Sequence, residues 1–477
     1  MCFDRYQNIK DMKTRFALTL FSVLFLWACN TYKNLPQAEG SLPYKVVKIP
    51  ASKQQLDGDP EAGFDFLVNG DYIGSGVPYG LFKRQMLKEP DTILRRKGLN
   101  ERVPYAVTAF RAPNGQKVVN GNCLTCHASP FQGEIVIGMG NSFSDYRRNL
   151  TTMAKLINFG MNLKYKKSAA EYQAYEDFGK YFREMAPHIE TNQAGANPAF
   201  RLAEACMMHR DPVDLTYVKE PNYEMNKYPI ATDVPPLWHV KKKNALYYNG
   251  IGRGDFTKLL FQASVLGIPD SAAARKAVTG FKDVLAWLNS LEPPSYPNSV
   301  NADLVAKGEV LFEKTCSNCH GTYGEEETYP NKLVSLDEVK TDPLYATYAY
   351  TSGIVEWYNN SWFAQSSPRS YFEPELAYMA PPLDGIWATA PYFHNGSVPN
   401  LEAVLNSKAR PKYWSRTGED APYDYTHVGW VYQIQEKPEG KWTFNTDLPG
   451  YSNTGHYFGD EFSTDERKAV IEYLKTL

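Results

Sequence analysis

The sequence predicts a mainly α fold of two helical domains, with an irregular N-terminal extension and insertions. Two observations predict this class. The motif C-x-x-C-H occurs twice, at residues 123–127 and 316–320. The segments VLAWLNSL (284–291) and VIEYLKTL (470–477) also repeat one amphipathic helical pattern. A chain of 477 residues is long enough for two or three domains.

The N-terminus resembles an export signal. The positive Lys13 and Arg15 precede twelve mostly apolar residues, 16–27, which are too few to span a bilayer. The stretch ends in LWAC, and this resembles the bacterial lipoprotein signal, in which the cysteine takes lipid after cleavage. We predict a lipoprotein-type signal peptide at residues 1–29, a lipid anchor at Cys29, and a periplasmic or cell-surface location. An ordinary secretory signal is the alternative.

Charge excludes one class of partner. The net charge is −2 and the pI is about 6.5, so the chain lacks the basic surface that tracks a phosphate backbone, and no nucleic acid is expected. The run of three lysines at 241–243 is interpreted as a solvated stretch.

The paired cysteines indicate a cofactor. A zinc site would have to join two pairs that 189 residues separate, and a redox dithiol does not need a histidine after its second cysteine. Covalent haem c accounts for every residue of the motif, because two thiols add to the two vinyl groups and the histidine binds the iron. We therefore predict two covalently bound haem c groups. The predicted attachment residues and proximal ligands are Cys123, Cys126, His127, Cys316, Cys319 and His320.

An internal repeat divides the chain. The segments PPLWHVKKKNALYYNG (235–250) and PPLDGIWATAPYFHNG (381–396) align without a gap, so each half contains a C-x-x-C-H motif, a PPL…NG segment and a closing helix. The predicted organisation is an N-terminal cytochrome c-like domain at 41–291, a proline-rich linker at 292–300, and a C-terminal cytochrome c-like domain at 301–477.

The two motifs are approached differently. Apolar residues at helical spacing around Leu304 and Phe312 predict an amphipathic helix before the second motif. A hairpin around Asn114-Gly115 is predicted before the first. Ser463 or Thr464 is expected to cap the closing helix of the second half.

The aligned segments differ where an axial ligand could lie. His394 of the second half aligns with Tyr248 of the first, so we predict His394 as the sixth ligand of the second haem, with Met379 as the alternative. Tyr248 and Trp238 are the candidate catalytic residues near the first haem, and no role is assigned to His456. Other side chains that could serve as the sixth ligand of the first haem are Met153, Met161, Met207, Met208 and His209.

Together these residues resemble a known group. Two motifs, with GIWATAPYFHNGSVPNL (385–401) after the second, resemble the bacterial di-haem cytochrome c peroxidase superfamily and, most closely, its rubber-oxygenase-like branch. The tail from GYSNTGHYFG onward is similar as well, and the resemblance covers most of residues 120–477. It implies a reactive N-terminal haem and a six-coordinate C-terminal haem that transfers electrons.

The resemblance also bears on the ligands. In the peroxidase branch a methionine ligates the second haem 14 residues after the HNG histidine, and this chain has Lys408 there. In the rubber-oxygenase branch the HNG histidine itself is the ligand, which corresponds to His394. Some members hold calcium between their domains, but this chain shows no ligand motif for it.

The expected function is that of an exported di-haem c-type cytochrome oxidoreductase. It would reduce peroxide or activate oxygen at the N-terminal haem, with electrons passed through the C-terminal haem. The alternatives are a non-catalytic electron-transfer cytochrome and an oxygenase acting on an apolar substrate. Expected partners are a small redox donor protein or a quinol-linked chain, a small-molecule oxidant, and the membrane through the lipid anchor.

Overall fold

The computed structural model describes residues 47–86 and 91–477. The predicted signal peptide, its Cys29 and residues 41–46 of the predicted first domain lie outside these residues. Within the described ranges, no helix is both long and apolar enough to cross a membrane.

The fold is mixed α/β. Helices hold 38% and strands 13% of the structure, and the strands form six small sheets, so the predicted mainly α fold of two helical cytochrome c-like domains is wrong. The prediction rests on a few helical segments and does not account for the chain that connects them. The chain has 33 Gly and 32 Pro, which interrupt helices and leave short segments that pair as strands.

The element bounds are as follows. The α-helices are α2 (Pro60–Asn69), α3 (Tyr79–Met86), α4 (Thr151–Lys164), α5 (Ala170–Met185), α6 (Ala199–Met207), α7 (Phe256–Phe261), α8 (Ser271–Val278), α9 (Phe281–Ser290), α10 (Ala302–Thr315), α11 (Ser317–His320), α12 (Leu336–Val339), α13 (Leu344–Thr351), α14 (Ile354–Asn359), α15 (Trp362–Gln365), α16 (Leu401–Leu405) and α17 (Thr464–Leu474). The strands are β1 (Val47–Lys48), β2 (Val77–Pro78), β3 (Val107–Arg111), β4 (Lys117–Gly121), β5 (Ala128–Phe131), β6 (Glu134–Ile137), β7 (Gly252–Gly254), β8 (Lys332–Ser335), β9 (Ser370–Phe372), β10 (Ala377–Met379), β11 (Tyr413–Ser415), β12 (Tyr423–Asp424), β13 (Gly429–Trp430), β14 (Gln433–Ile434) and β15 (Thr443–Asn445).

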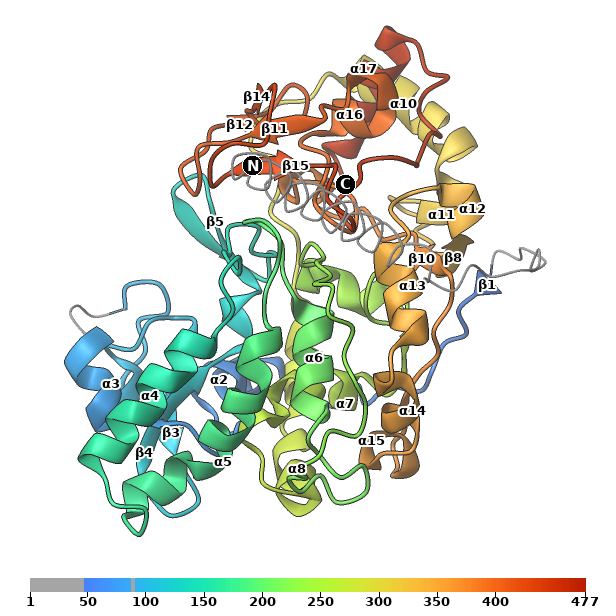
Figure 1. Cartoon of the computed structure of the whole chain (residues 1–477). Coiled ribbons are helices and arrows are strands. Elements are labelled where there is room, and N and C mark those ends of the chain that lie inside the picture. The colour runs from blue at the N-terminus through green and yellow to red at the C-terminus, as the bar shows by residue number, and fades with distance from the viewer. Residues whose placement is uncertain (1–46, 87–90) are drawn as a thin grey trace, which may run out of the picture. The chain divides into compact units, whose positions relative to one another are not determined.

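Each half contains one pair of closely packed helices, α2 with α9 and α10 with α17 (Figure 1). A glycine allows each close approach. A Cβ on Gly63 would lie 1.9 Å from the carbonyl oxygen of Asp283, and one on Gly308 would lie 2.0 Å from that of Ala469. The N-terminal extension is therefore not irregular, because α2 gives the first half its counterpart of α10. Ser463 caps α17 in a capping box, as predicted.

The predicted hairpin before the first motif is confirmed. Strands β3 and β4 pair antiparallel with Arg111 opposite Lys117, and the N–H of Gly115 donates to the Ala112 carbonyl over 2.8 Å. Gly115 has a φ of 82°, a left-handed conformation that glycine adopts without strain. Strand β2 completes this three-stranded sheet.

Residues from both halves build the larger hydrophobic core, which we call the first core. The ring of Phe200 lies 5.8 Å from that of Tyr345, and Phe261 lies 6.4 Å from Trp362. Strand β9 pairs with β7, and β8 joins β1 and β10 in a second shared sheet. Helices α13 to α15 thus pack with elements that precede residue 292.

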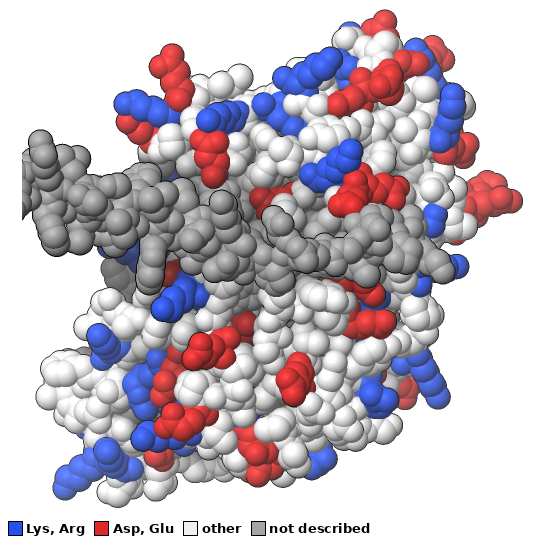
Figure 2. Space-filling model, turned by 45° about the vertical axis from the view of Figure 1, so that its right-hand side comes forward, with Lys and Arg blue, Asp and Glu red and all other residues white. Residues whose placement is uncertain are grey.

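In a second hydrophobic core, residues of the first half pack among residues of the second half. Phe131 and Phe143, which follow the first motif, pack on Trp387 at 5.7 Å and Trp430 at 5.2 Å. The boundary at 292–300 stays a prediction, but hydrophobic contacts cross it in both directions. On the face drawn in Figure 2, Lys and Arg are interspersed with Asp and Glu.

Candidate haem centres

The PPL…NG repeat folds into the same turn twice. Leu246 bridges Gly252 in the first copy and Tyr392 bridges Val398 in the second, a shift of 146 residues that matches the sequence alignment. The residue before each aligned ligand position has a φ of 70° in both copies. Tyr248 and His394 therefore occupy equivalent positions in two turns with the same backbone conformation.

The repeat also places a carbonyl beside each motif histidine. Nδ1 of His320 donates to the carbonyl of Pro381 over 2.8 Å, and this bond fixes the tautomer that leaves Nε2 free to bind a metal. Burial lowers the pKa of His320, although the hydrogen bond to the Pro381 carbonyl acts in the opposite direction. Burial likewise lowers the pKa of His127 to about 4, against the carbonyl of the aligned Pro235. Both imidazoles are neutral, as a metal ligand must be.

The second motif opens into a cavity of about 290 Å³. Helix α10 ends just before Cys316, α11 carries Cys319 and His320, and all three residues lie in the cavity wall. Burial raises the pKa of the Cys316 thiol to about 12. The lining is largely apolar, with Phe312 and Leu383 among its residues, so the cavity suits a large flat hydrophobic group.

A histidine without a sequence-based role faces the second motif. The ring of His456 lies 6.2 Å from that of His320, centroid to centroid. A metal–imidazole bond is about 2 Å long, so two rings that share one ion from opposite sides have centroids roughly 6 Å apart. Burial, followed by the charges of His320 and Arg410, lowers the pKa of His456 to about 3. Its Nδ1 is buried without a hydrogen-bond partner.

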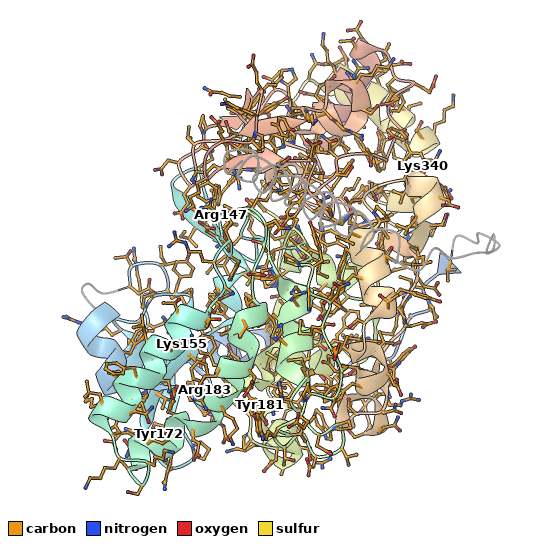
Figure 3. The ribbon with its side chains drawn as sticks, viewed as in Figure 1. Arg147, Lys155, Tyr172, Tyr181, Arg183 and Lys340 are labelled. Carbon is orange, nitrogen blue, oxygen red and sulfur yellow. The ribbon has the colours of Figure 1, made fainter. Side chains whose placement is uncertain are left out.

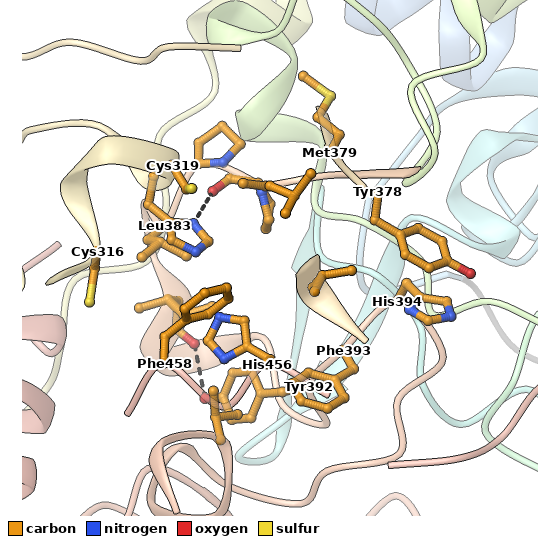
Figure 4. A pocket seen from close by; sticks show the side chains of 18 of the residues that line it. Cys316, Cys319, Tyr378, Met379, Leu383, Tyr392, Phe393, His394, His456 and Phe458 are labelled. Atoms are coloured by element: carbon orange, nitrogen blue, oxygen red, sulfur yellow. Dashed lines mark hydrogen bonds between the residues drawn. The ribbon is translucent and has the colours of Figure 1, made fainter. Parts of the chain in front are cut away.

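Arg410 positions the loop that carries His456. Its Nη1 donates to the carbonyls of Asn453 at 2.8 Å and Gly455 at 2.6 Å, and its Nη2 donates to that of His456 at 3.2 Å. The imidazole stands beside the rings of Phe393 and Phe458 (Figure 4). Sequence reasoning missed His456, although the tail GYSNTGHYFG in which it lies was part of the family resemblance.

The two ligands predicted for the second site also line the cavity. His394 does not face His320. Its ring stacks on Tyr378 at 4.0 Å, and its Nε2 is buried without a partner (Figure 4). Met379 lies in β10, with its N–H bonded to the Tyr248 carbonyl at 2.7 Å. The geometry favours His456 over both as the partner of His320.

The first motif follows the hairpin directly. Cys123 begins a short 3₁₀ helix, Cys123–Thr125, and His127 leads into β5. Burial raises the pKa of Cys123 to about 11, and the side-chain amide of Asn197 donates to Cys126 Sγ over 3.2 Å. Within residues 47–86 and 91–477, no histidine ring faces His127 as His456 faces His320.

The other side chains proposed as a sixth ligand at the first site differ in their surroundings. Both ring nitrogens of His209 have neighbours, with Nδ1 at 3.2 Å from the Val218 carbonyl and Nε2 at 3.8 Å from Glu184. Met153 is exposed on α4. The remaining alternatives, Met161, Met207 and Met208, are buried.

Trp238 bridges the segments that hold the two sites. Its Nε1 donates to the Asp384 carbonyl over 2.8 Å, three residues after Pro381. On the other side, the N–H of Leu237 donates to the Gly138 carbonyl, and the N–H of Gly138 donates to the His127 carbonyl, both at 2.8 Å. Trp238 therefore belongs to a continuous bonded path between the two motifs.

Tyr248, the other catalytic candidate, lines the cavity of the second motif and lies beside a buried carboxyl group. Its hydroxyl donates to Asp233 Oδ2 over 3.4 Å. Burial raises the pKa of Asp233 to about 8, against its hydrogen bonds and the charge of Arg416. The carboxyl group is thus largely protonated at neutral pH and can hold a proton at the wall of this cavity.

Two cations near these sites form no ion pair with a carboxylate in the described part of the chain. Lys243 lines the cavity, and its Nζ has neither a hydrogen bond nor an ion pair with any described residue; burial lowers its pKa to about 8. Arg416 donates to the hydroxyl and the carbonyl of Ser142. The preceding residue, Asn141, donates its N–H to the Cys126 carbonyl, so Arg416 lies close in the chain of bonds to the first motif. The triple-lysine run is therefore not simply solvated, because Lys241 and Lys242 pair with Glu292 and Asp384.

These features fit covalent haem. The second motif has two thiols, two facing neutral imidazoles and a mostly apolar cavity, and the first has two thiols and a buried imidazole. A haem also brings two propionate carboxylates, and buried cations need such partners. Lys243 would hold a propionate at the second motif, and Arg416 would hold one at the first.

Comparison with known proteins supports this chemistry. Residues 377–415 match a family model described as RoxA-like, cytochrome c-like. The uncharacterized protein y4iJ of Sinorhizobium fredii is 28% identical over 253 residues, 39% of this chain and 41% of its own length. The protein y4iM of the same organism is 25% identical over 304 residues, 55% of this chain and 68% of its own.

The family match bears on the resemblance drawn from the sequence. It supports a RoxA-like cytochrome branch, covalent binding of haem c and a haem oxidoreductase. The broader peroxidase superfamily is not confirmed. The match covers β10, the HNG turn and α16, and it therefore includes the second copy of the repeat.

Proposed function

We propose that this chain is an exported, lipid-anchored di-haem c-type oxidoreductase that reduces peroxide or activates oxygen at the first motif and receives electrons through the second. The observation that carries the proposal is the asymmetry of the motifs: His456 faces His320, and no described histidine faces His127. A haem iron with an open axial position reacts with small oxidants, whereas one with two strong axial ligands passes electrons.

The chain's own residues support these roles. The Pro381 carbonyl orients the imidazole of His320, and Arg410 holds His456 in place. Trp238 lies on the bonded path between the motifs and is the proposed electron relay. Asp233 and Tyr248 line the cavity of the second motif and would hold a buried proton there.

One spectroscopic experiment tests the proposal. EPR and optical spectra of the purified, haem-loaded protein are recorded in the oxidised and half-reduced states, before and after hydrogen peroxide. We expect one low-spin haem that peroxide leaves unchanged and one haem whose signal changes with peroxide. Two low-spin signals, unaffected by peroxide in both states, would instead establish a non-catalytic electron carrier.

A further inference from the structure

Helix α4 carries a stripe of exposed apolar side chains. Met153, Leu156, Phe159 and Leu163 are 46%, 65%, 66% and 77% exposed. Their spacing of three, three and four residues places them on one face of the helix. Large apolar side chains are rarely left in water on one continuous surface, so this stripe indicates a binding face.

The opposite face of α4 anchors the helix in the first core. Ala154 and Met161 are 3% and 0% exposed, and Ile157 packs partly buried beside them. The stripe is therefore not a core face turned outward. With one face packed on the protein, α4 holds its second apolar face at a fixed place on the surface.

The charged residues of α4 itself are all basic. The helix contains Lys155 and Lys164 and no Asp or Glu, in a chain whose net charge is −2; of the four Lys and Arg that flank it, Arg147 is paired with Asp145. Lys155, labelled on α4 in Figure 3, and Lys164 lie about 100° and 80° to either side of Leu156 around the helix axis. They border the stripe on both edges, and neither forms an ion pair with a described residue.

We propose that α4 binds the surface of an anionic membrane. Phe and Leu on one helical face, with lysines along both edges, is the arrangement that lies in the plane of a bilayer interface, where the apolar side chains enter the acyl boundary and the ammonium groups reach the headgroups. Two lysines that border the stripe and form no ion pair, on a helix without acidic residues, favour anionic lipid over a protein partner of mixed charge. This inference does not depend on the proposed redox function.

Vesicle binding tests the proposal. The mature, haem-loaded chain, residues 30–477, is produced behind a cleavable signal so that Cys29 is absent and no lipid is attached. Binding is measured by co-sedimentation with phosphatidylglycerol–phosphatidylcholine vesicles and with pure phosphatidylcholine vesicles. We expect binding to the anionic vesicles that weakens as salt is raised.

Variants separate the stripe from general surface effects. The double variant Leu156→Ser, Phe159→Ser should lower the partition coefficient about tenfold or more, and Lys155→Glu, Lys164→Glu should abolish the preference for anionic lipid. Val310→Ser on α10 is the matched control, because Val310 is also 65% exposed, and it should bind normally. Unchanged haem spectra establish folding. Failure to bind anionic vesicles, equal binding by the α4 variants, or a stripe that only joins two copies in analytical ultracentrifugation would overturn the proposal.

Discussion

The two C-x-x-C-H sites share a backbone and differ in their side chains. Both have a prolyl carbonyl beside the motif histidine and the same HNG-type turn after it. On that common frame, the first copy has Asp233 and Tyr248 where the second has Met379 and His394. The second motif alone among the described residues has a facing histidine, and it comes from outside the repeat. The two copies of the repeat thus share a turn, and His456, which lies outside the repeat, makes the two motifs unequal.

Removing the thiols breaks the comparison most directly. The double variants Cys123→Ala, Cys126→Ala and Cys316→Ala, Cys319→Ala should each lose one covalently bound haem, because haem c depends on the thioether bonds. The pyridine haemochrome assay should give about half the haem per chain of the unaltered protein in each case. If either pair can be removed without loss of covalent haem, the chain holds one haem c and the di-haem proposal fails.

The facing histidine gives the next largest effect. His456→Ala should convert the second haem from low spin to high spin, because it removes a strong axial imidazole. The matched variant His394→Ala should leave that haem low spin, since His394 stacks on Tyr378 and does not face His320. EPR of the oxidised proteins distinguishes the two outcomes. The reverse result would assign the ligand to His394.

The unpaired cations allow each site to be tuned separately. Lys243→Met should lower the reduction potential of the second haem, and Arg416→Met that of the first, because loss of a nearby positive charge disfavours the added electron. Lys243→Arg should restore most of the shift. Spectroelectrochemical titration resolves the two haems. Equal shifts at both haems in either variant would contradict the assignment of one cation to each site.

The smallest expected effect is a pH dependence of stability. The pKa of Asp233 is raised from 3.8 to about 8 by burial, so the unfolded chain releases this proton before the folded one does. The stabilisation is complete below about pH 4 and is lost as the pH rises to about 8. Asp233→Asn should flatten this part of the curve of melting temperature against pH. A parallel curve, merely displaced, would show that Asp233 does not titrate there.

Local patterns in the sequence were sufficient for several features. The motifs, the hairpin at Asn114-Gly115, the helix before Cys316 and both closing helices follow from spacing, turn chemistry and amphipathic periodicity, and the structure contains each of them. These signals reside within about twenty residues of chain, so tertiary contacts are not needed to detect them.

Long-range features could not be predicted in this way. His456 lies 136 residues after His320, and its position depends on Arg410 and on a loop without a regular pattern. The small sheets consist of strands of two to five residues, too short to show alternation. The helix α2 was missed because the hairpin separates it from Cys123, which hid its correspondence with α10.

The shared first core bears on how the molecule is made. If the chain is exported from its N-terminus, as proposed, Cys123 and Cys126 emerge long before Tyr345 and Trp362, and those later rings complete the core. The early thiols therefore cannot be sealed inside a finished core until the last third of the chain arrives. Under the proposed function, this order of synthesis would keep the first motif accessible to the enzyme that attaches haem.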